Sequence, residues 1–385
     1  MRTVSKLNTL ASETTNKKIF GLDFLRAIAV ILVFFWHFRR YGIPDWLNGI
    51  SKFGWTGVDL FFVLSGYLIG AQLFSKISKA KPISAYRFYF KRFFRIIPAY
   101  LVVLILYFTV PLFNERDDIS PLWKFLTFTM NFGLDYQNAG SFSHAWSLCI
   151  EEQFYFLFPL IVILLSKIKA ENKAMLILLG IFVFGVITII YSWQTFVSQI
   201  YYDKENMTLI GNTYSKYVYY PTYNRLDGLL VGIFISLLFT FKPMIANKIL
   251  PRANLFFLMG IIILITTYYL CADQFSFHSA VFSYPLVSIG YGFLVIAVLS
   301  PRCFINRFNF KAFSLLATLS YSVYLTHKQL NHITQNLLTD YHLNKNWMIV
   351  ICFVVSIVGG IVLHLTIERP FLMLRDKLLK RTWVK

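Results

Sequence analysis

The chain alternates between long apolar stretches and short polar segments that are mostly basic. A stretch of about 20 apolar residues can cross the hydrocarbon core of a bilayer, and it does so as a helix because lipid cannot satisfy open backbone groups. Stretches near this length occur at 23–38, 53–74, 96–113, 145–165, 174–192, 225–241, 254–271, 281–300, 313–327 and 347–367. The sequence therefore predicts an all-α, polytopic membrane helix bundle with about ten transmembrane helices.

The distribution of basic residues predicts the orientation. If both termini are cytoplasmic, the inside segments carry 26 Lys and Arg residues and the outside loops carry 9. This bias agrees with the positive-inside rule. An eleventh crossing at 121–133 would invert every later loop, so this shorter apolar stretch, which begins at Pro121, is interpreted as interfacial or re-entrant.

These spans predict one membrane domain. Residues 1–22 form a cytoplasmic N-terminal segment, 23–367 form the transmembrane core, and 368–385 form a basic cytoplasmic tail. We expect no cleavable signal peptide, because no small-residue cleavage site follows the first apolar stretch. The tail is too short to bury a soluble core.

Composition narrows the function classes. Of 385 residues, 57% are hydrophobic and 14% are charged, whereas a soluble protein has about 25% charged residues. A soluble enzyme and a disordered chain are thereby excluded. The net charge of +19 is explained by basic residues at the cytoplasmic ends of the spans, so we predict no nucleic-acid partner. Four cysteines do not form a disulfide scaffold, and no metal-ligand spacing is present, so we predict no metal.

Ionisable residues inside predicted spans point to function, because each costs at least ~2.5 kcal/mol on insertion scales. The first span holds Asp23, Arg26 and His37. Asp23 and Arg26 are close enough to pair. Arg26 and His37 share one helix face, about 16 Å apart along the axis. Asp59 of the second span lies level with His37, and we expect the carboxylate to pair with the imidazole.

Other predicted spans bring polar residues to the same outer depth. These residues are Glu151, Glu152, Arg225, Asp227, Tyr321, Tyr324 and His327. Adjacent residues on a helix point about 100° apart, so at most one of Glu151 and Glu152 should face any one site. Buried charges at this depth must be paired within the bundle.

A second group of charges lies just before the third span. Arg92 and Arg95 are three residues apart and project from one helix face, which suits a phosphate or pyrophosphate. The alternative is an ordinary positive-inside cluster that contacts anionic lipid headgroups.

Six motifs in this order resemble the acyltransferase-3 family of integral membrane acyltransferases, which includes bacterial O-acetyltransferases of cell-surface polysaccharides. They are GLDFLRAIAVILVFFWHF, GVDLFFVLSGYLIG, RFFRIIPAY, HAWSLCIEEQFYFLFPL, SYSVYLTH and IERP. The resemblance spans nearly the whole chain. It implies a ten-helix core in the bacterial cytoplasmic membrane that takes an acetyl group from cytosolic acetyl-CoA as co-substrate.

The resemblance also assigns roles. The essential histidine of the family falls on His37, an arginine earlier in the same helix falls on Arg26, and the donor-binding Arg-x-x-Arg motif falls on Arg92 and Arg95. We expect Arg26 to help these two arginines bind the donor. The catalytic group is completed by Asp59 and Glu152. Substrate binding is assigned to Glu151, Arg225, Asp227, Tyr324 and His327.

Two chemistries remain open for the predicted catalytic histidine. His37 can act as a general base on an acceptor hydroxyl, oriented by Asp59, or it can carry the acetyl group itself. Arg225 and Tyr324 are the candidates that stabilise the oxyanion.

The acceptor predicted from the resemblance is a hydroxyl of a carbohydrate or lipid-linked glycan. Some family members carry a fused SGNH-type domain. None is expected in this chain, so a separate extracytoplasmic transferase is a possible partner. The alternative function is a transporter or exporter of a glycan or small solute, because intramembrane charges also mark transport pathways.

Overall fold

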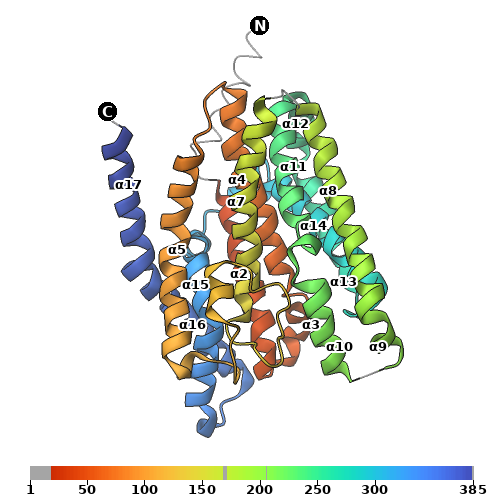
Figure 1. Ribbon diagram of the computed structural model, residues 1–385, viewed down its shortest axis with the longest axis vertical. Coiled ribbons are helices and arrows are strands. Elements are labelled where there is room, and N and C mark those ends of the chain that lie inside the picture. The colour runs from red at the N-terminus through yellow and green to blue at the C-terminus, as the bar shows by residue number, and fades with distance from the viewer. Residues whose placement is uncertain (1–18, 168–170, 205, 384–385) are drawn as a thin grey trace.

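The computed structural model describes residues 19–167, 171–204 and 206–383, and within these ranges the fold is all-α with no β-strand (Figure 1). Residues 1–18 of the predicted N-terminal segment and residues 384–385 of the predicted tail lie outside the described residues. The all-α membrane bundle predicted from the sequence is confirmed.

Long helices make up most of the bundle. They are α2 (Phe20–Phe38), α4 (Thr56–Ser78), α5 (Ala85–Thr109), α7 (Trp146–Lys167), α8 (Glu171–Ser192), α11 (Asp227–Phe241), α13 (Ala253–Leu270), α14 (Phe277–Val298), α15 (Lys311–Leu337), α16 (Lys345–Leu363) and α17 (Arg369–Trp383). Short helices connect them: α3 (Asn48–Lys52), α6 (Leu122–Leu126), α9 (Ser198–Tyr202), α10 (Met207–Tyr214) and α12 (Pro243–Ile249).

Eight of the ten predicted spans coincide with helices that are long and apolar enough to cross a membrane, among the described residues. The predicted span 225–241 falls on α11, which is apolar but has only 15 residues. The span 313–327 falls on α15, which has 27 residues but carries many polar side chains. Those side chains are buried, since α15 packs against both α2 and α16.

Two predicted boundaries can be compared with helix ends. The stretch 121–133 forms only the five-residue α6, so it does not make an eleventh crossing. The last helix continues past residue 367, the predicted end of the transmembrane core. A π-helical turn, His364–Glu368, joins α16 to α17, and the continuous helix extends through Arg381. Much of the predicted tail is therefore a continuation of the last helix.

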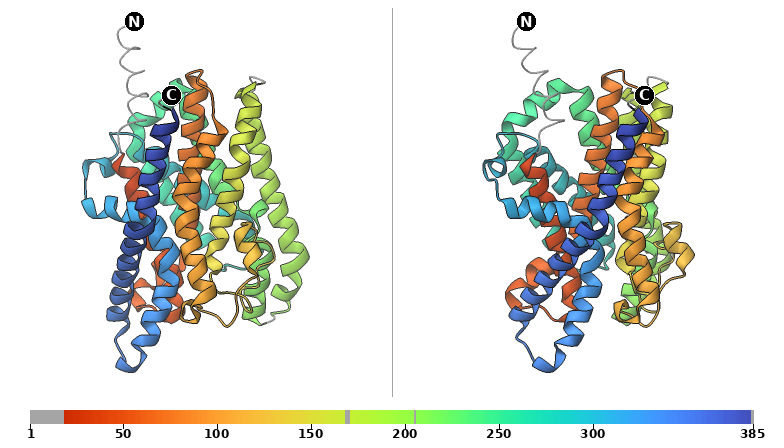
Figure 2. Two further views of the ribbon diagram at one scale, coloured as in Figure 1. Left: turned by 60° about the vertical axis from the view of Figure 1, so that its left-hand side comes forward. Right: turned by 90° about the vertical axis from the view of Figure 1, so that its left-hand side faces the viewer.

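The centre of the bundle is built by α2, α4, α11, α14 and α15, and the pairs α4–α11 and α15–α16 have extensive contacts. We call the end that carries α12 the upper end and the end that carries α3 and α10 the lower end (Figure 1). The start of α2 and the end of α17 both lie in the upper half (Figure 2). The first and last long helices therefore begin and end in the same half of the bundle, and the cytoplasmic location of the termini stays a prediction.

Small residues allow α4 and α11 to approach closely. A Cβ atom at Gly66 would lie 2.1 Å from the Leu229 carbonyl oxygen, and one at Gly232 would lie 2.2 Å from the Val63 carbonyl oxygen. Such contacts with backbone atoms leave no room for a side chain, as in other membrane helix pairs with small residues at the interface. The glycines of the GVDLFFVLSGYLIG motif that face α11 therefore serve helix packing.

Replacing Gly232 by valine is expected to lower the free energy of unfolding by about 2–3 kcal/mol, because the close backbone contact forces the two helices apart. Thermal unfolding of the detergent-solubilised protein measures this loss. Gly180→Val in α8 is the matched control, since a Cβ atom there meets no atom within 4 Å. Equal losses in the two variants would contradict the importance of this packing.

Candidate functional site

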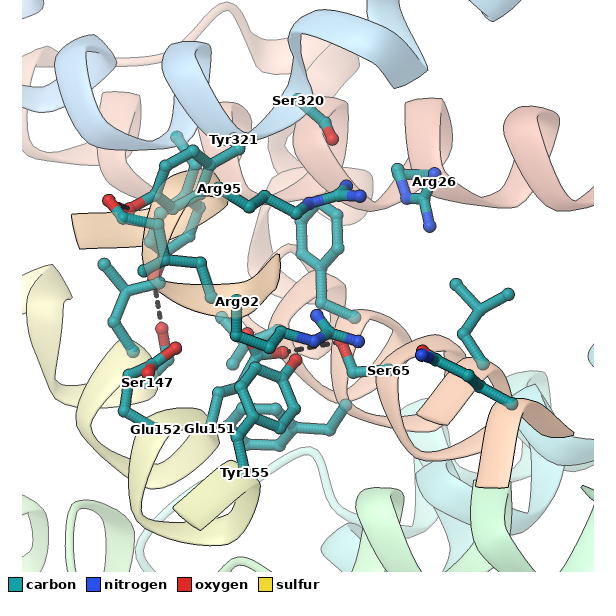
Figure 3. Close-up of a pocket in the computed structure, with 18 residues that line it drawn as sticks. Arg26, Ser65, Arg92, Arg95, Ser147, Glu151, Glu152, Tyr155, Ser320 and Tyr321 are labelled. Atoms are coloured by element: carbon teal, nitrogen blue, oxygen red, sulfur yellow. Dashed lines mark hydrogen bonds between the residues drawn. The ribbon is translucent and has the colours of Figure 1, made fainter. Parts of the chain in front are cut away.

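A cavity of about 330 Å³ opens between α2, α4, α5, α7 and α15, and we call it the arginine cavity (Figure 3). Three arginines from two helices line it: Arg26 of α2, and Arg92 and Arg95 of α5. The Arg92 guanidinium lies over the Tyr155 ring, 4.6 Å from its centroid. The spacing of three residues puts Arg92 and Arg95 on one face of α5, as the sequence predicts.

The three guanidinium groups face a common open region (Figure 3). In the part of the chain that the structure describes, none of them forms an ion pair with a carboxylate within 4.0 Å. Guanidinium groups present planar forks of donors that fit phosphate oxygens. The cavity therefore offers three cations to an anionic ligand.

Glu151 and Glu152 of α7 both line the arginine cavity. The Ser65 hydroxyl donates a hydrogen bond of 2.8 Å to Glu151 Oε1. The expectation that at most one of these neighbours faces a given site is wrong, because the cavity is wide enough to accept side chains from both directions on the helix. The structure groups both glutamates with the arginines, so Glu152 does not line the cavity of His37.

A second cavity, of about 270 Å³, is lined by His37, and we call it the histidine cavity. His37 lies in the last turn of α2, toward the lower end, and its ring is half-buried. His144 and Lys328 also line this cavity. The ring centroids of His37 and His144 lie 6.0 Å apart.

The hydrogen bonds of His327 define the proton positions on His37. His327 Nδ1 lies 2.8 Å from the Tyr324 carbonyl oxygen, which can only accept, so Nδ1 carries the proton of the neutral ring. His327 Nε2 is then an acceptor, and it lies 2.9 Å from His37 Nδ1. His37 Nδ1 therefore carries the proton and donates it, and the Val33 carbonyl oxygen is a second acceptor at 3.1 Å from the same Nδ1. Neutral His37 is left with a free lone pair on Nε2.

The predicted partner of His37 is therefore wrong. Asp59 does not pair with His37 but forms a fully buried ion pair with Arg225, with 2.5 Å between Oδ1 and Nη2. The Arg225 guanidinium lies against the rings of Tyr219 and Tyr284, at 4.6 and 4.1 Å from their centroids. Arg225 makes these contacts within the buried core and lines neither of the two cavities.

Asp227 joins the same buried group and not a substrate cavity. The Ser288 hydroxyl donates a hydrogen bond to Asp227 Oδ2. The polar residues predicted at one depth are therefore divided into three groups: the arginine cavity, the histidine cavity and this buried ion-pair group between α4, α11 and α14. Helix periodicity places a residue at a depth, but the packing of neighbouring helices decides which residues meet.

Replacing Arg225 by methionine is expected to destabilise the protein by about 3–5 kcal/mol, because Asp59 is left buried without its partner. The double variant Asp59→Asn, Arg225→Met should recover much of this stability, since no charge of the pair remains. Thermal unfolding in detergent measures all three proteins. A double variant no more stable than Arg225→Met would contradict this interpretation of the pair.

Two residues of the histidine cavity were not identified in the sequence analysis. Lys328 is buried, and its Nζ donates to Ser143 Oγ at 2.8 Å and lies 3.7 Å from Glu115 Oε1. His144 is also buried. Lys328 directly follows His327, and His144 is the first residue of the HAWSLCIEEQFYFLFPL motif. The available signals were a basic residue adjacent to a predicted site residue and a histidine within a family motif.

The arginine and histidine cavities are neighbours, and Val58 lines both. Tyr324 lies at this junction: its ring lines the arginine cavity, and its carbonyl oxygen holds His327. The Tyr324 hydroxyl donates to the His144 carbonyl oxygen at 2.9 Å and accepts from Ser147 at 2.6 Å. The space between the arginines and His37 is therefore divided into two adjoining cavities.

The three histidines of this region do not form a metal centre. No group of three or more His, Cys, Asp or Glu side chains within the described ranges is arranged to hold a metal ion.

Comparison with known proteins gives one consistent result. The acyltransferase-3 family, described as an acyltransferase domain, matches residues 19–365. The chain is similar to the O-acetyltransferase OatA of Staphylococcus aureus strain NCTC 8325 / PS 47, with 30% identity over 331 residues, which cover 80% of this chain and 49% of OatA. OatA of strain COL matches equally. The chain thus spans about half the length of these relatives. No solved structure matches it.

Proposed function

Since the chain belongs to the acyltransferase-3 family, we propose that it is the membrane core of an O-acetyltransferase that uses acetyl-CoA and acetylates a hydroxyl of a cell-surface carbohydrate or glycolipid. The observation that carries this proposal is the juxtaposition of two cavities with different chemistry. One offers three arginines that form no ion pair within the described ranges, and the other offers a histidine whose Nε2 has no hydrogen-bond partner among the described residues. They adjoin at Val58.

The arginine cavity is the proposed donor site. The phosphate groups of coenzyme A are anionic, and Arg26, Arg92 and Arg95 can bind them through charge-assisted hydrogen bonds. Glu151 and Glu152 in the same cavity can keep the guanidinium groups apart and oriented. The axial distance of about 16 Å between Arg26 and His37 is comparable to the length of a pantetheine arm.

The upper end is assigned to the cytosol in this proposal. The end of α4 and the segment that joins it to α5 lie at that end and hold three basic residues, Lys76, Lys79 and Lys81, in agreement with the positive-inside rule. The arginine cavity is then reached from the cytosol, where acetyl-CoA is made, and the histidine cavity lies toward the opposite face.

His37 performs the proton transfer in this mechanism. A thioester supplies an acetyl group that is already activated for attack. The Nε2 atom of His37 can take the proton of the acceptor hydroxyl. The oxygen of that hydroxyl then bonds to the acetyl carbonyl carbon, and the coenzyme A thiolate leaves. His327 keeps His37 in the required tautomer, the role first predicted for Asp59.

The same atom, His37 Nε2, can instead accept the acetyl group directly and pass it to the hydroxyl. Both routes develop negative charge on the carbonyl oxygen. Among the cations that line the histidine cavity, Lys328 is buried, whereas Arg39 and Arg40 are partly or fully exposed, so Lys328 replaces Arg225 as the candidate that stabilises this charge.

The proposed activity is tested with the full chain reconstituted in liposomes and supplied with acetyl-CoA labelled in the acetyl group. We expect label to appear on a glycan extracted from the source cells. Analysis of surface glycans from cells with and without the gene should reveal one missing ester. Uptake or release of a labelled solute without any acetyl-CoA-dependent ester would instead support the transporter.

A further inference from the structure

A third cavity, of about 260 Å³, lies at the lower end beside the histidine cavity, and we call it the lower cavity. The two cavities share the side chains of Arg39, Trp55, Tyr219 and Gln274. A molecule that occupies the lower cavity is therefore next to the space that His37 lines. This is the position required of the group that receives the acetyl.

The lining of these two cavities carries charge of one sign. Arg39, Arg40, Lys52 and Lys328 contribute cations, whereas the described residues that line the cavities include no Asp or Glu. Lys328 is partly compensated by Glu115. Arg39, Arg40 and Lys52 form no ion pair within 4.0 Å in the described ranges. The arginine cavity differs, because two glutamates accompany its arginines.

The uncharged part of the lower cavity suits a polar, hydroxylated ligand. Aromatic rings of Trp55, Tyr219 and Tyr284 combine an apolar face with a polar group at the edge. Gln274 and Ser283 add amide and hydroxyl groups that can donate and accept hydrogen bonds. Sugar rings present the matching surfaces: C–H faces that stack on aromatic rings and hydroxyl groups around the rim.

We propose that the acceptor is an anionic saccharide, one whose sugar carries a carboxylate or phosphate, and that it binds in the lower cavity through Arg39 and Lys52 with a hydroxyl directed toward His37. This inference rests on the proposed function and narrows its acceptor. Cations that lack a protein partner attract anions, and walls of low dielectric strengthen that attraction. A neutral glycan would leave these charges without a partner.

An anionic lipid headgroup shares the same charge but fits the geometry less well. The aromatic rings and hydrogen-bonding groups line a cavity that continues to the histidine cavity, and they do not form a flat rim around the bundle. The saccharide is therefore the occupant that uses all three features: the charges, the rings and the connection to His37.

The test compares two probes that differ only in charge. Binding of oligogalacturonate and of its methyl ester is measured on the full chain in nanodiscs of phosphatidylcholine. We expect the acid to bind about tenfold more tightly at low salt, equivalent to ~1.4 kcal/mol, and the preference to shrink as salt is added. The variant Arg39→Gln, Lys52→Gln should lose the preference, and Lys52→Gln alone should lose part of it.

Lys204→Gln is the control, because Lys204 is exposed and lines neither cavity. Binding of coenzyme A should be the same in all these variants, which shows that they are folded and tests the donor site independently. Equal binding of acid and ester would overturn the anionic acceptor. The proposal would also be overturned if the protein bound phosphatidylglycerol vesicles through Arg39 and Lys52 but did not bind the acid. If the unmodified chain did not bind coenzyme A, the proposed function itself would be overturned.

Discussion

Replacing His37 by glutamine is expected to lower acetyl transfer by about 10²–10⁴-fold, because glutamine has no ring nitrogen that can take the proton of the acceptor or carry the acetyl group. The side chain can still donate toward His327 and the carbonyl oxygen of Val33, so the helix packing should survive. Acetyl-CoA-dependent labelling in proteoliposomes measures the loss. Thermal unfolding and coenzyme A binding should remain near the unmodified values.

The matched control for this prediction is His278→Gln. His278 is exposed in the first turn of α14 and lines neither the arginine nor the histidine cavity. Full activity in His37→Gln would remove this imidazole from the mechanism and with it the assignment of the histidine cavity.

Variants of His327 separate positioning from packing in the same assay. His327→Gln keeps an amide oxygen that can accept the proton of His37 Nδ1, so transfer should fall less than in His327→Leu, which offers no acceptor. The two variants should bind coenzyme A equally. Equal transfer in the two would show that His327 only fills space.

Replacing Arg92 and Arg95 together by glutamine is expected to weaken binding of coenzyme A by about 100-fold. Two charge-assisted hydrogen bonds are lost, each worth about 1.5 kcal/mol, and 1.4 kcal/mol corresponds to a factor of ten. Neither guanidinium forms an ion pair within 4.0 Å with a described carboxylate, so the double variant breaks no direct ion pair. Calorimetric titration of the detergent-solubilised protein with coenzyme A gives the dissociation constant.

Lys91→Gln is the control for that titration. Lys91 adjoins Arg92 in the sequence but does not line the arginine cavity, and its replacement removes one positive charge of the same basic cluster. A similar loss in both proteins would indicate a general effect of the basic cluster. Unchanged binding in the double variant would favour the alternative in which these arginines contact lipid headgroups.

Most of the architecture could be predicted from the pattern of residues. Apolar length predicts spanning helices because an unpaired backbone is excluded from lipid, and the excess of basic residues in alternate loops predicts that both ends lie on one side. The spacing of Arg92 and Arg95 places both side chains on one face of α5. The order of motifs identifies the family and points to His37.

The neighbours of each side chain were less predictable. Asp59 was expected beside His37 because both lie at one depth, yet it pairs with Arg225 across the α4–α11 contact. His327 takes the place beside His37, since α15 packs against α2. Lys328 enters the same cavity from the next position of α15.

By itself, then, the sequence determined the all-α membrane class and the place of most spanning helices along the chain, because these follow from hydrophobicity and from the need of a backbone in lipid to form its own hydrogen bonds. Only the tertiary structure decided which polar groups meet and that the path to His37 consists of adjoining cavities. The physical reason is that a helix in lipid can rotate about its axis without changing its depth. Its rotation is set by close packing at small residues such as Gly66 and Gly232.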